Sequence, residues 1–468
     1  MYRTFIITIV VLTFLNGCDN TKTAIINGSL DNVTDKSISI SIGSDPRTLL
    51  KTKENASKID ILEDGSFSYS IDFNSPIWLT FISDNAQFVS YVFIMHPGET
   101  QIAADCSKSF ETIEYSGVNG PLNSFYRKWN RLYNGILREL KSNELAYEDW
   151  VFNLDSIETV FSEMLLEFKK EKPLKKDELY WLSSRIKHSK YSTLLSRAYR
   201  SGSKPEDNDF DFFEKLDLND EKACKIDQRY NRLIHRYVLH QVNSDGVFYV
   251  PAGDNTQFHE LMYNTALKKL SGEVRDVVLN ILVSDLLSKN ETAAPEYYER
   301  FLNDCNSKDL LEMTRHLYDE YLALATKELD HEVVRIQTEN HSPMEVLSKF
   351  ENKVLYLDFW ASWCSPCINS IPMTIKLANH FQDKDVEVLY IGHNDQENNL
   401  ESAIKKHEIS GKHLILNQEE TEVWRKEFNV EGIPSYVLLD RNHKVVEFHA
   451  PHPDDQLIYT MIDSLLLE

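Results

Sequence analysis

The spacing of hydrophobic residues changes twice along the chain, so that three kinds of structure follow one another. After the N-terminal segment, hydrophobic and polar residues alternate in short runs such as Ser37 to Ile42 and Ile77 to Ile82. Alternation with a period of two places one side of a strand in a core and the other side in water. Asp64-Gly65 and Pro97-Gly98 interrupt these runs and are typical of turns. The pattern predicts a β-sandwich-like domain over residues 19–118.

From about residue 119 the hydrophobic residues lie three or four positions apart. Phe125, Trp129, Leu132 and Ile136 are an example, and this spacing places them on one face of a helix. The pattern has no fixed repeat that would indicate a solenoid. We therefore predict an all-α region over residues 119–330, with the hydrophobic stripes forming its core.

The last part of the chain alternates strands with helices. A hydrophobic run from Val354 to Trp360 is followed by a helical pattern from Pro366 to Phe381 and by a second hydrophobic run from Val386 to Ile391. The stretch from Ser435 to Phe448 has the pattern of a closing hairpin. Strands that alternate with helices form a largely parallel sheet. Residues 331–468 are therefore predicted to form an α/β domain.

Two cysteines lie where the first of these strands gives way to its helix. Cys364 and Cys367 are separated by Ser365 and Pro366. The first turn of a helix has unsatisfied N–H groups and a positive dipole end, and both favour a thiolate at Cys364. Pro366 fits there because its missing N–H group would have no partner in the helix. One cysteine can thus attack a disulfide while the other lies one helical turn away to resolve it.

Several segments match a known family. Asp358-Phe359-Trp360-Ala361 and Trp363-Cys364-Ser365-Pro366-Cys367 resemble the active-site segment of thioredoxins, and Gly432-Ile433-Pro434-Ser435 resembles the cis-proline loop of that fold. An inserted helix at residues 400–407 and a strand at residues 413–417 are similar to the membrane-anchored TlpA/ResA branch of this family. The resemblance covers the last quarter to third of the chain and implies a C-terminal thioredoxin fold.

The resemblance implies an activity and its participants. It implies a thiol–disulfide oxidoreductase that works through a Cys364/Cys367 dithiol without a cofactor. Its implied partners are protein disulfides and a membrane electron donor. Ile433, joined to Pro434 by a cis peptide bond, would offer its backbone to an extended substrate segment. The residues implied in substrate binding are Trp363, Ser365, Pro366, Ile433 and Pro434.

Asp358 is an ionisable residue inside a hydrophobic strand, where a charge costs free energy unless it is paired or neutralised by a proton. Thioredoxins have a buried carboxylate at this position, which makes Asp358 the candidate proton acceptor for Cys367. The alternative is an aspartate that points out of the sheet at the end of the strand. Thioredoxins also carry a buried lysine on the neighbouring strand, where this chain has Tyr390. His393 follows that strand in a loop-like segment and is predicted to be a surface residue.

The N-terminal residues have the features of a targeting signal. Arg3 precedes a hydrophobic run from Phe5 to Leu15, which is too short to span a bilayer, and Cys18 follows shortly after. Residues 1–18 resemble a bacterial lipoprotein signal, in which Cys18 becomes the lipidated first residue of the mature protein. We therefore expect a lipid-anchored protein of the cell envelope that faces the periplasm. An ordinary cleaved signal or an anchor helix is the alternative.

The composition and net charge of the chain argue against some classes of binding partner. The chain has 468 residues, of which 42% are hydrophobic and 26% charged, as is usual for a folded soluble protein. Its formal net charge of -23 argues against nucleic acid and an anionic membrane surface as electrostatic partners, because both repel an acidic protein. No second close pair of cysteines exists beside Cys364 and Cys367, so no metal site is predicted. Cys106, Cys224 and Cys305 are expected to be buried free thiols, with one long-range disulfide as the alternative.

Three functions fit these observations. The favoured one is a reductase of protein disulfides, because Ser365 and Pro366 supply no cation that would stabilise the Cys364 thiolate and make the couple oxidising. A thiol peroxidase on the same fold is the second, but such enzymes normally have Thr or Ser three residues before the reactive cysteine, where this chain has Ala361. The third is a non-catalytic envelope lipoprotein that binds a partner and uses the thioredoxin-like domain as a clamp.

Overall fold

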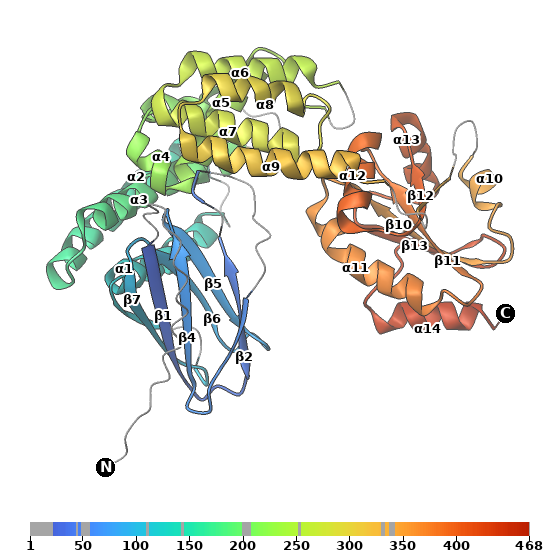
Figure 1. Ribbon diagram of the computed structural model, residues 1–468, viewed down its shortest axis with the longest axis horizontal. Helices are drawn as coiled ribbons and strands as arrows, with labels where there is room; N and C mark the ends of the chain where they lie inside the picture. Colours follow the sequence, from blue (N-terminus) through green and yellow to red (C-terminus); the bar gives the residue numbers. More distant parts are fainter. Residues whose placement is uncertain are drawn as a thin grey trace. The chain divides into compact units, whose positions relative to one another are not determined.

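The structure is a computed structural model that describes residues 22–43, 45–47, 57–108, 112–141, 145–198, 207–250, 254–328, 333–336 and 342–467 (Figure 1). The predicted signal and Cys18 lie outside the described residues. The chain folds into two compact units. The first extends to Lys215 and includes residues 222–230, and the second comprises residues 216–221 and the chain from Asn231 onward. The helical region contributes to both units.

Within the described residues, the first unit contains two four-stranded sheets, with strand orders β4-β1-β7-β8 and β3-β2-β5-β6. Strand β1 pairs with β7 in parallel, and the other neighbours pair antiparallel. Both sheets contribute to one core, as in a sandwich, so the predicted N-terminal β architecture is confirmed. The strands are β1 (Lys22–Asp31), β2 (Ser37–Ile42), β3 (Ser57–Asp60), β4 (Ser66–Phe73), β5 (Ile77–Ser83), β6 (Val89–Ile94), β7 (Gly98–Asp105) and β8 (Glu114–Gly117).

The alternating sequence explains which side of each strand is buried. In β2 the side chains of Ile38 and Ile40 are fully buried, and in β5 Phe81 is buried while Ile82 is exposed. Gly65, in the turn before β4, has a φ of 77°, a value that glycine adopts more readily than other residues. The sequence therefore fixes both the faces and one turn of the sandwich.

Helices follow the sandwich, and the predicted helical region is confirmed. Helix α2 ends directly before Lys172-Pro173, as expected for a residue pair that breaks helices. The helices are α1 (Gly120–Lys141), α2 (Tyr147–Glu171), α3 (Lys176–Ala198), the 3-10 helix η2 (Asp207–Lys215), α4 (Glu221–Ile226), α5 (Gln228–Ser244), α6 (Thr256–Lys269), α7 (Gly272–Ser288), α8 (Ala294–Asp304) and α9 (Lys308–Thr326).

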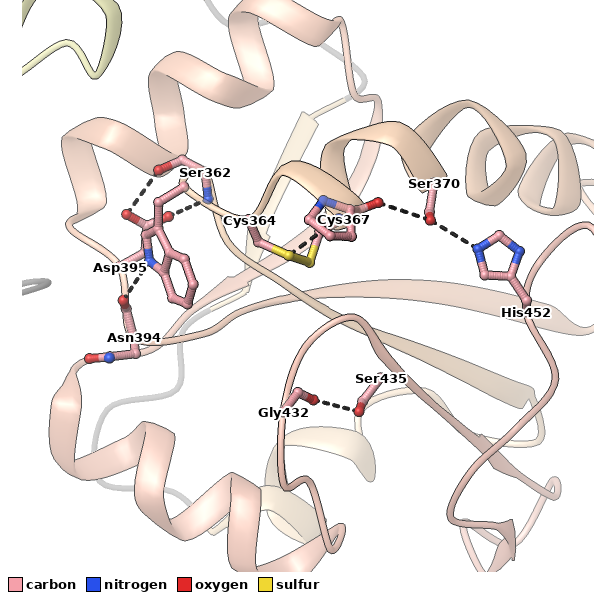
Figure 2. The surroundings of a disulfide bond; sticks show 11 residues. Ser362, Cys364, Cys367, Ser370, Asn394, Asp395, Gly432, Ser435 and His452 are labelled. Carbon is pink, nitrogen blue, oxygen red and sulfur yellow. Dashed lines mark hydrogen bonds between the residues drawn. A yellow bond between two sulfur atoms is a disulfide. The ribbon is translucent and has the colours of Figure 1, made fainter. Parts of the chain in front are cut away.

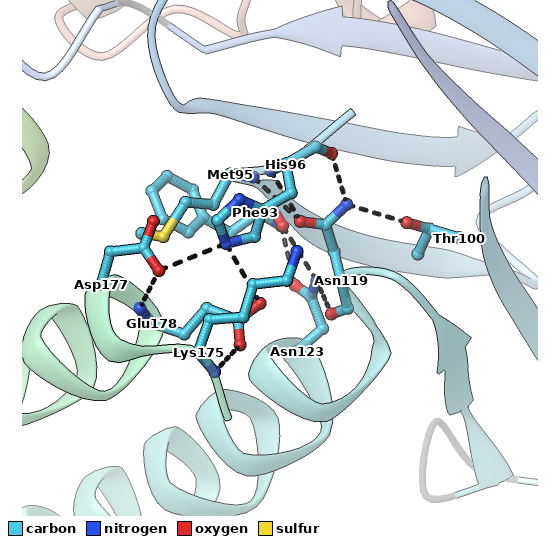
Figure 3. A network of polar contacts seen from close by, with 9 residues as sticks. All are labelled: Phe93, Met95, His96, Thr100, Asn119, Asn123, Lys175, Asp177 and Glu178. Carbon is cyan, nitrogen blue, oxygen red and sulfur yellow. Dashed lines mark hydrogen bonds and ion pairs between the residues drawn. The ribbon is translucent and has the colours of Figure 1, made fainter. Parts of the chain in front are cut away.

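Two buried asparagines join the start of α1 to the end of β6 (Figure 3). The side-chain oxygen of Asn119 accepts hydrogen bonds from the N–H groups of Met95 and His96, at 3.1 and 3.0 Å. Asn123 accepts a hydrogen bond from the N–H group of Phe93 and donates one to its carbonyl group, at 2.7 and 2.9 Å. These side chains pair with backbone groups at the end of β6 and just after it, so the strand can end against a helix with those backbone groups satisfied.

A buried carboxylate joins α3 to the junction between α4 and α5. Asp227 accepts hydrogen bonds from Arg185 at 2.9 Å, from Nδ1 of His188 at 2.9 Å and from the hydroxyl of Ser184 at 3.0 Å. The N–H group of Arg229 donates to the same carboxylate at 3.1 Å. Burial alone would raise the pKa of Asp227, but the hydrogen bond from His188 and the charge of Arg185 outweigh it and hold the pKa well below its usual range.

The second unit ends in an α/β domain with a six-stranded sheet of order β14-β13-β10-β11-β12-β9. Strands β10, β11, β12 and β9 are parallel, and β13 and β14 complete the sheet with antiparallel pairing. The elements are β9 (Val333–Ile336), α10 (Pro343–Leu347), β10 (Val354–Trp360), α11 (Ser365–His380), β11 (Val386–Gly392), α12 (Glu397–His407), β12 (Gly411–Ile415), α13 (Gln418–Glu427), β13 (Ser435–Leu439), β14 (Val445–Glu447) and α14 (Gln456–Leu465).

Strand β10 is central in the sheet and fully buried, and its alternate residues pack into two different hydrophobic cores. Tyr356 and Trp360 face a core that also receives residues of α11, α12 and α14. Leu357 and Phe359 face the opposite core, which receives residues of α10 and α13. A strand covered on both faces needs a continuous hydrophobic run, and this explains the sequence from Val354 to Trp360. The end of β10 and the start of α11 position the two cysteines.

Candidate active site

Cys364 and Cys367 form a disulfide at the N-terminus of α11 (Figure 2). Their sulfur atoms are 2.00 Å apart and their Cα atoms 5.2 Å apart. Cys364 is the N-cap residue of α11, and Pro366 lies in the first turn. Cys364 is 5% exposed and Cys367 is 2% exposed. The structure thus places the pair at the strand-to-helix junction that the sequence predicted.

The start of α11 can stabilise negative charge on Cys364. The N–H group of Cys367 donates a hydrogen bond to Sγ of Cys364 at 3.2 Å. The same N–H group and the positive end of the helix dipole would favour a thiolate at Cys364 once the disulfide is reduced. Ser365 and Pro366 are exposed and carry no charge. The helix terminus is therefore the feature of this site that would favour a thiolate at Cys364.

The loop before β13 contains a cis peptide bond between Ile433 and Pro434, the isomer that the sequence predicted. Ile433 is partly buried and packs against the core cluster that contains both cysteines. The hydroxyl of Ser435 donates to the carbonyl of Gly432 at 2.6 Å and closes the loop, which Figure 2 draws below the disulfide. The loop thus borders the reactive pair, and the substrate-binding role of Ile433 and Pro434 stays a prediction.

Trp363 is 50% exposed, and its indole N–H group donates to the carbonyl of Asn394 at 3.0 Å. Beside it, the carboxylate of Asp395 accepts hydrogen bonds from the backbone N–H group and the hydroxyl of Ser362 (Figure 2). Burial raises the pKa of Asp395, although the hydrogen bonds from Ser362 oppose this rise. The segment after β11 therefore fixes the loop that leads into Cys364.

Sequence reasoning missed this segment, and one prediction about it is wrong. His393 was expected on the surface, but it is 8% exposed. Its N–H group donates to the carbonyl of Trp360 at 2.8 Å, so the pairing of β11 with β10 continues past the hydrophobic run and keeps His393 inside. The signal for Asp395 was its place directly after a strand of a parallel sheet, since sites of such sheets lie at this edge.

Asp358 lies in β10 and is 2% exposed, which excludes an aspartate that points into solvent. The hydroxyl of Thr374 on α11 donates to its Oδ2 at 2.8 Å. Burial raises the pKa of Asp358 to about 7, and the Thr374 hydrogen bond and the charge of His452 oppose the rise. Such a carboxyl group can accept and release a proton near neutral pH. Its role as the proton acceptor for Cys367 stays a prediction.

The strand next to Asp358 supplies an aromatic ring. Asp358 is in register with Tyr390 of β11, the position of the thioredoxin lysine. The ring of Tyr390 stacks on His413, with centroids 4.9 Å apart. Among the described residues no hydrogen-bond partner exists for the buried Tyr390 hydroxyl. Strand β11 therefore supplies no positive charge for Asp358, and a cation near this carboxyl group would belong to a different element.

The structure also bears on membrane-spanning helices, on metal sites and on the cysteines outside the disulfide. None of the helices that the structure describes is long and hydrophobic enough to cross a bilayer. In the same residues, no group of three His, Cys, Asp or Glu side chains is placed to hold a metal ion. Cys224 and Cys305 are buried as expected, whereas Cys106 is partly exposed, and Cys106 and Cys305 are free thiols. Trp360 is fully buried in the core that contains both cysteines.

Known proteins resemble the C-terminal part of the chain. Thiol-disulfide oxidoreductase ResA of Bacillus cereus is 26% identical over 101 residues, which are 22% of this chain and 57% of that protein. ResA of Halalkalibacterium halodurans is 22% identical over 122 residues, or 25% of this chain and 66% of that protein. The matched part of the chain therefore spans 57% and 66% of the length of these two relatives. The solved thioredoxin domain of a thiol-disulfide oxidoreductase from Bacteroides vulgatus is 22% identical, covers 26% of this chain and 84% of that chain, and has a TM-score of 0.24.

A family model described as thioredoxin-like matches residues 352–445. The matched segment includes the disulfide at the start of α11 and the cis peptide bond before β13. These are the two features by which the sequence resembled thioredoxins. The C-terminal part of this chain therefore contains a thioredoxin-like domain.

Proposed function

We propose that the protein is a thiol–disulfide oxidoreductase that reduces protein disulfides in the cell envelope through Cys364 and Cys367. The observation that carries the proposal is a disulfide closed across the first turn of α11, with Cys364 as the N-cap residue. A cysteine in this position forms a thiolate readily, and a second cysteine one turn away can displace whatever the first has bound. The relatives named thiol-disulfide oxidoreductase support the same activity.

The reaction is an exchange of disulfides. The Cys364 thiolate attacks a sulfur atom of the substrate, so a mixed disulfide forms and the other substrate sulfur leaves and takes a proton from water. Cys367 then loses its proton and attacks Sγ of Cys364, which breaks the mixed disulfide. The substrate gains two electrons and leaves as a dithiol, while the protein keeps the disulfide. A dithiol donor at the membrane returns two electrons and closes the cycle.

Substrate recognition rests on the surface around the disulfide. Trp363 offers an exposed aromatic face, and Ser365 and Pro366 are also exposed. Ile433 and Pro434 border the pair, and the backbone of Ile433 can pair with an extended substrate segment. Recognition of main chain rather than side chains would let the site accept many protein disulfides.

Turnover of a model protein disulfide tests the activity and separates the three candidate functions. With a dithiol as electron donor, the full chain should reduce the disulfide, and Cys364→Ser should reduce it no faster than the donor alone. A matched control is Cys106→Ser, which removes a distant thiol and should leave turnover unchanged. Consumption of hydrogen peroxide without disulfide reduction would favour the peroxidase, and neither activity would favour the binding clamp.

Trapping tests which cysteine attacks. Cys367→Ser should accumulate mixed disulfides with substrates, because the resolving thiol is gone, whereas Cys364→Ser should trap few or none. Non-reducing gels of the two variants would read this out, and the trapped proteins would identify the substrates. Equal trapping by both variants would contradict the assigned roles.

The direction of the reaction depends on the reduction potential. Helix α11 stabilises the Cys364 thiolate without help from a cation at Ser365 or Pro366, so we expect a potential nearer the roughly -270 mV of thioredoxin than the roughly -120 mV of a periplasmic oxidant. Equilibration of the full chain with glutathione buffers measures this value. A potential above about -180 mV, the isomerase range, would reverse the assignment to an oxidase or isomerase.

The envelope location is part of the proposal and depends on Cys18. Two or more acyl chains on this residue would anchor the protein stably to a membrane while the rest faces the periplasm. Cys18→Ser should then release the protein into the soluble fraction or leave it unprocessed. An unchanged mature mass and membrane fraction in this variant would contradict the lipid anchor.

A further inference from the structure

The buried carboxyl of Asp358 needs an opposite charge if it is to ionise during the reaction. It is 2% exposed and has the Thr374 hydroxyl as a hydrogen-bond donor at 2.8 Å. A neutral donor compensates only part of the cost of burying a charge. Tyr390, on the neighbouring strand, contributes no charge. His452 is the one ionic influence on Asp358 within the described residues.

His452 reaches the active-site helix from the loop between β14 and α14. The loop is tied to the sheet, because the hydroxyl of Tyr356 donates to the carbonyl of Pro451 at 2.9 Å. Nε2 of His452 lies 2.9 Å from the hydroxyl of Ser370, which is on α11 one turn after Cys367 (Figure 2). The side chain of His452 is 40% exposed. One edge of the ring therefore faces α11 while the side chain remains open to solvent.

The hydrogen-bond pattern fits a positively charged ring. When the Ser370 hydroxyl donates its one proton to the carbonyl of Pro366, 3.1 Å away, Nε2 of His452 is the donor toward Ser370. Nδ1 lies 2.6 Å from a carboxylate oxygen of Asp454, which can only accept when ionised. Both ring nitrogens then carry a proton, which is the imidazolium form.

We propose, on the basis of the proposed thiol–disulfide exchange, that His452 is a positioning residue that supplies the positive charge for Asp358 during the attack of Cys367 on Cys364. In that step the Cys367 proton moves to the Asp358 carboxylate, a sulfur–sulfur bond forms between the two cysteines, and the bond from Cys364 to the substrate breaks. The substrate sulfur leaves with the electron pair. Asp358 afterwards returns its proton to solvent, and a nearby imidazolium favours that return because it stabilises the carboxylate.

The other groups around this pair stay neutral over the working pH range. Asp358 faces Tyr390 on β11, and burial raises the pKa of that hydroxyl above its usual range. Tyr436 on β13 meets the His452 ring edge-on, with centroids 5.5 Å apart, and burial raises its pKa as well. The same holds for Tyr356 on β10. The charges that decide the ionisation of Asp358 are thus those of His452 and, behind it, Asp454.

A two-phase reaction of the full chain tests the proposal. The reduced protein is mixed with a chromogenic aromatic disulfide: attack by Cys364 releases one coloured thiolate at a rate that depends on reagent concentration, and attack by Cys367 releases a second at a rate that does not. Cys367→Ser should remove the second phase and so identifies it. The pH midpoint of this second phase reports the group that accepts the Cys367 proton, as a value that belongs to the coupled pair.

His452→Gln keeps a hydrogen-bonding side chain but removes the charge. Its second-phase midpoint should move up by about half a pH unit, which makes the phase about threefold slower at a fixed pH below the midpoint. His452→Lys keeps a positive charge and should not raise the midpoint. His449→Gln is the matched control, because His449 is an exposed histidine a few residues away, and it should match the wild type. The first phase should be the same in all three variants.

Each remaining outcome decides the matter. An unchanged midpoint in His452→Gln, or an equal rise in His452→Lys or His449→Gln, overturns the inference while leaving the proposed function intact. Absence of both phases in the wild type overturns the proposed function instead. If His452→Gln does not fold, His452→Asn provides the test, because it removes the same charge and should raise the midpoint in the same direction.

Discussion

Two buried aspartates of this chain, Asp227 and Asp358, have opposite electrostatic surroundings. Asp227 accepts hydrogen bonds from Arg185, His188 and other donors, and these hold its pKa below the usual range. Asp358 accepts a hydrogen bond from Thr374, and burial raises its pKa to about 7. Both carboxyl groups are almost fully withdrawn from water. The two carboxyl groups differ in the number of hydrogen-bond donors and charged groups around them.

The difference indicates how to tell a structural buried acid from a reactive one. A carboxylate with enough donors and a guanidinium group stays ionised at every working pH, so Asp227 can hold helices together but has no proton to exchange. Asp358 has fewer compensating groups, and its proton can come and go near neutral pH. A perturbed pKa in the upward direction is therefore the more informative sign of chemistry in this chain.

The largest loss of stability is expected when Asp227, whose carboxylate accepts several hydrogen bonds, is replaced. Asp227→Ala leaves Arg185 and Arg229 buried without their counter-charge, and loss of one partner of a buried ion pair costs about 3–5 kcal/mol. Urea unfolding of the first unit should show this loss, with Ser184→Ala as a milder control because the other donors remain. A loss below about 1 kcal/mol would mean that the network contributes little to stability.

Asp358→Asn should affect stability in the opposite direction and only at higher pH. The pKa of Asp358 is about 7 in the folded protein and about 4 in the unfolded chain. Between these values the folded protein retains a proton that the unfolded chain has lost, so the stability contributed by this group falls as the pH rises and is fully lost above about pH 7. Asp358→Asn should therefore be more stable than the wild type at pH 8, by up to about 4 kcal/mol, and equal to it near pH 4.

Denaturation of both proteins across this pH range measures the difference. Asp227 provides the contrast, because its lowered pKa gives a contribution that is present above about pH 4 and is lost on acidification. A stability difference between Asp358→Asn and the wild type that does not change with pH would contradict the raised pKa of Asp358.

The same substitution should slow catalysis. Without the carboxylate, Cys367 loses its general base, and a loss of about 100-fold in disulfide turnover at neutral pH is expected. Mixed disulfides on Cys364 should accumulate at the same time, because attack by Cys364 itself is not affected. Turnover that remains within about twofold of the wild type would remove Asp358 from the reaction.

The smallest expected effect concerns the hydroxyl of Thr374. Thr374→Val keeps the shape of the buried side chain but removes the hydrogen bond to Asp358, which is worth about 1 kcal/mol. Because that bond lowers the pKa of Asp358, its loss should raise the pH midpoint of the Cys367 step by up to about one unit. A midpoint that falls would show that the hydroxyl favours the neutral carboxyl instead.

The parts of the fold that sequence predicts well are those with a strong local pattern. The fully hydrophobic run from Val354 to Trp360 predicts the buried strand β10, and Cys364 with Pro366 predicts the start of α11. Ile433-Pro434 predicts the cis loop. In each case a few adjacent residues determine the structure, so the sequence signal is contained in one short window.

Features that depend on contacts between residues far apart in the sequence cannot be predicted from one short window. Helix α13 (Gln418–Glu427) is highly polar, and its buried residues are Thr421 and Trp424. Its sequence therefore has no hydrophobic stripe from which a helix could be predicted. Asp395 and His452 appear as polar loop residues, and their importance follows from Ser362 and Ser370, which are 33 and 82 positions away. The sequence thus predicted the cysteine pair, Asp358 and the cis-proline loop, but it did not predict the contacts of Asp395 and His452.

The strand β9 (Val333–Ile336) has a consequence for how the C-terminal domain can be cut out of the chain. It covers one edge of the sheet by pairing with β12, and it lies before residue 352, where the family match begins. Val346 and Leu347 of α10, also before that point, are fully buried in one of the two cores. A fragment that starts at residue 352 would therefore expose hydrophobic surface and an unpaired strand edge, which is a template for aggregation. The segment that the family model matches is therefore shorter than the α/β unit that packs around it.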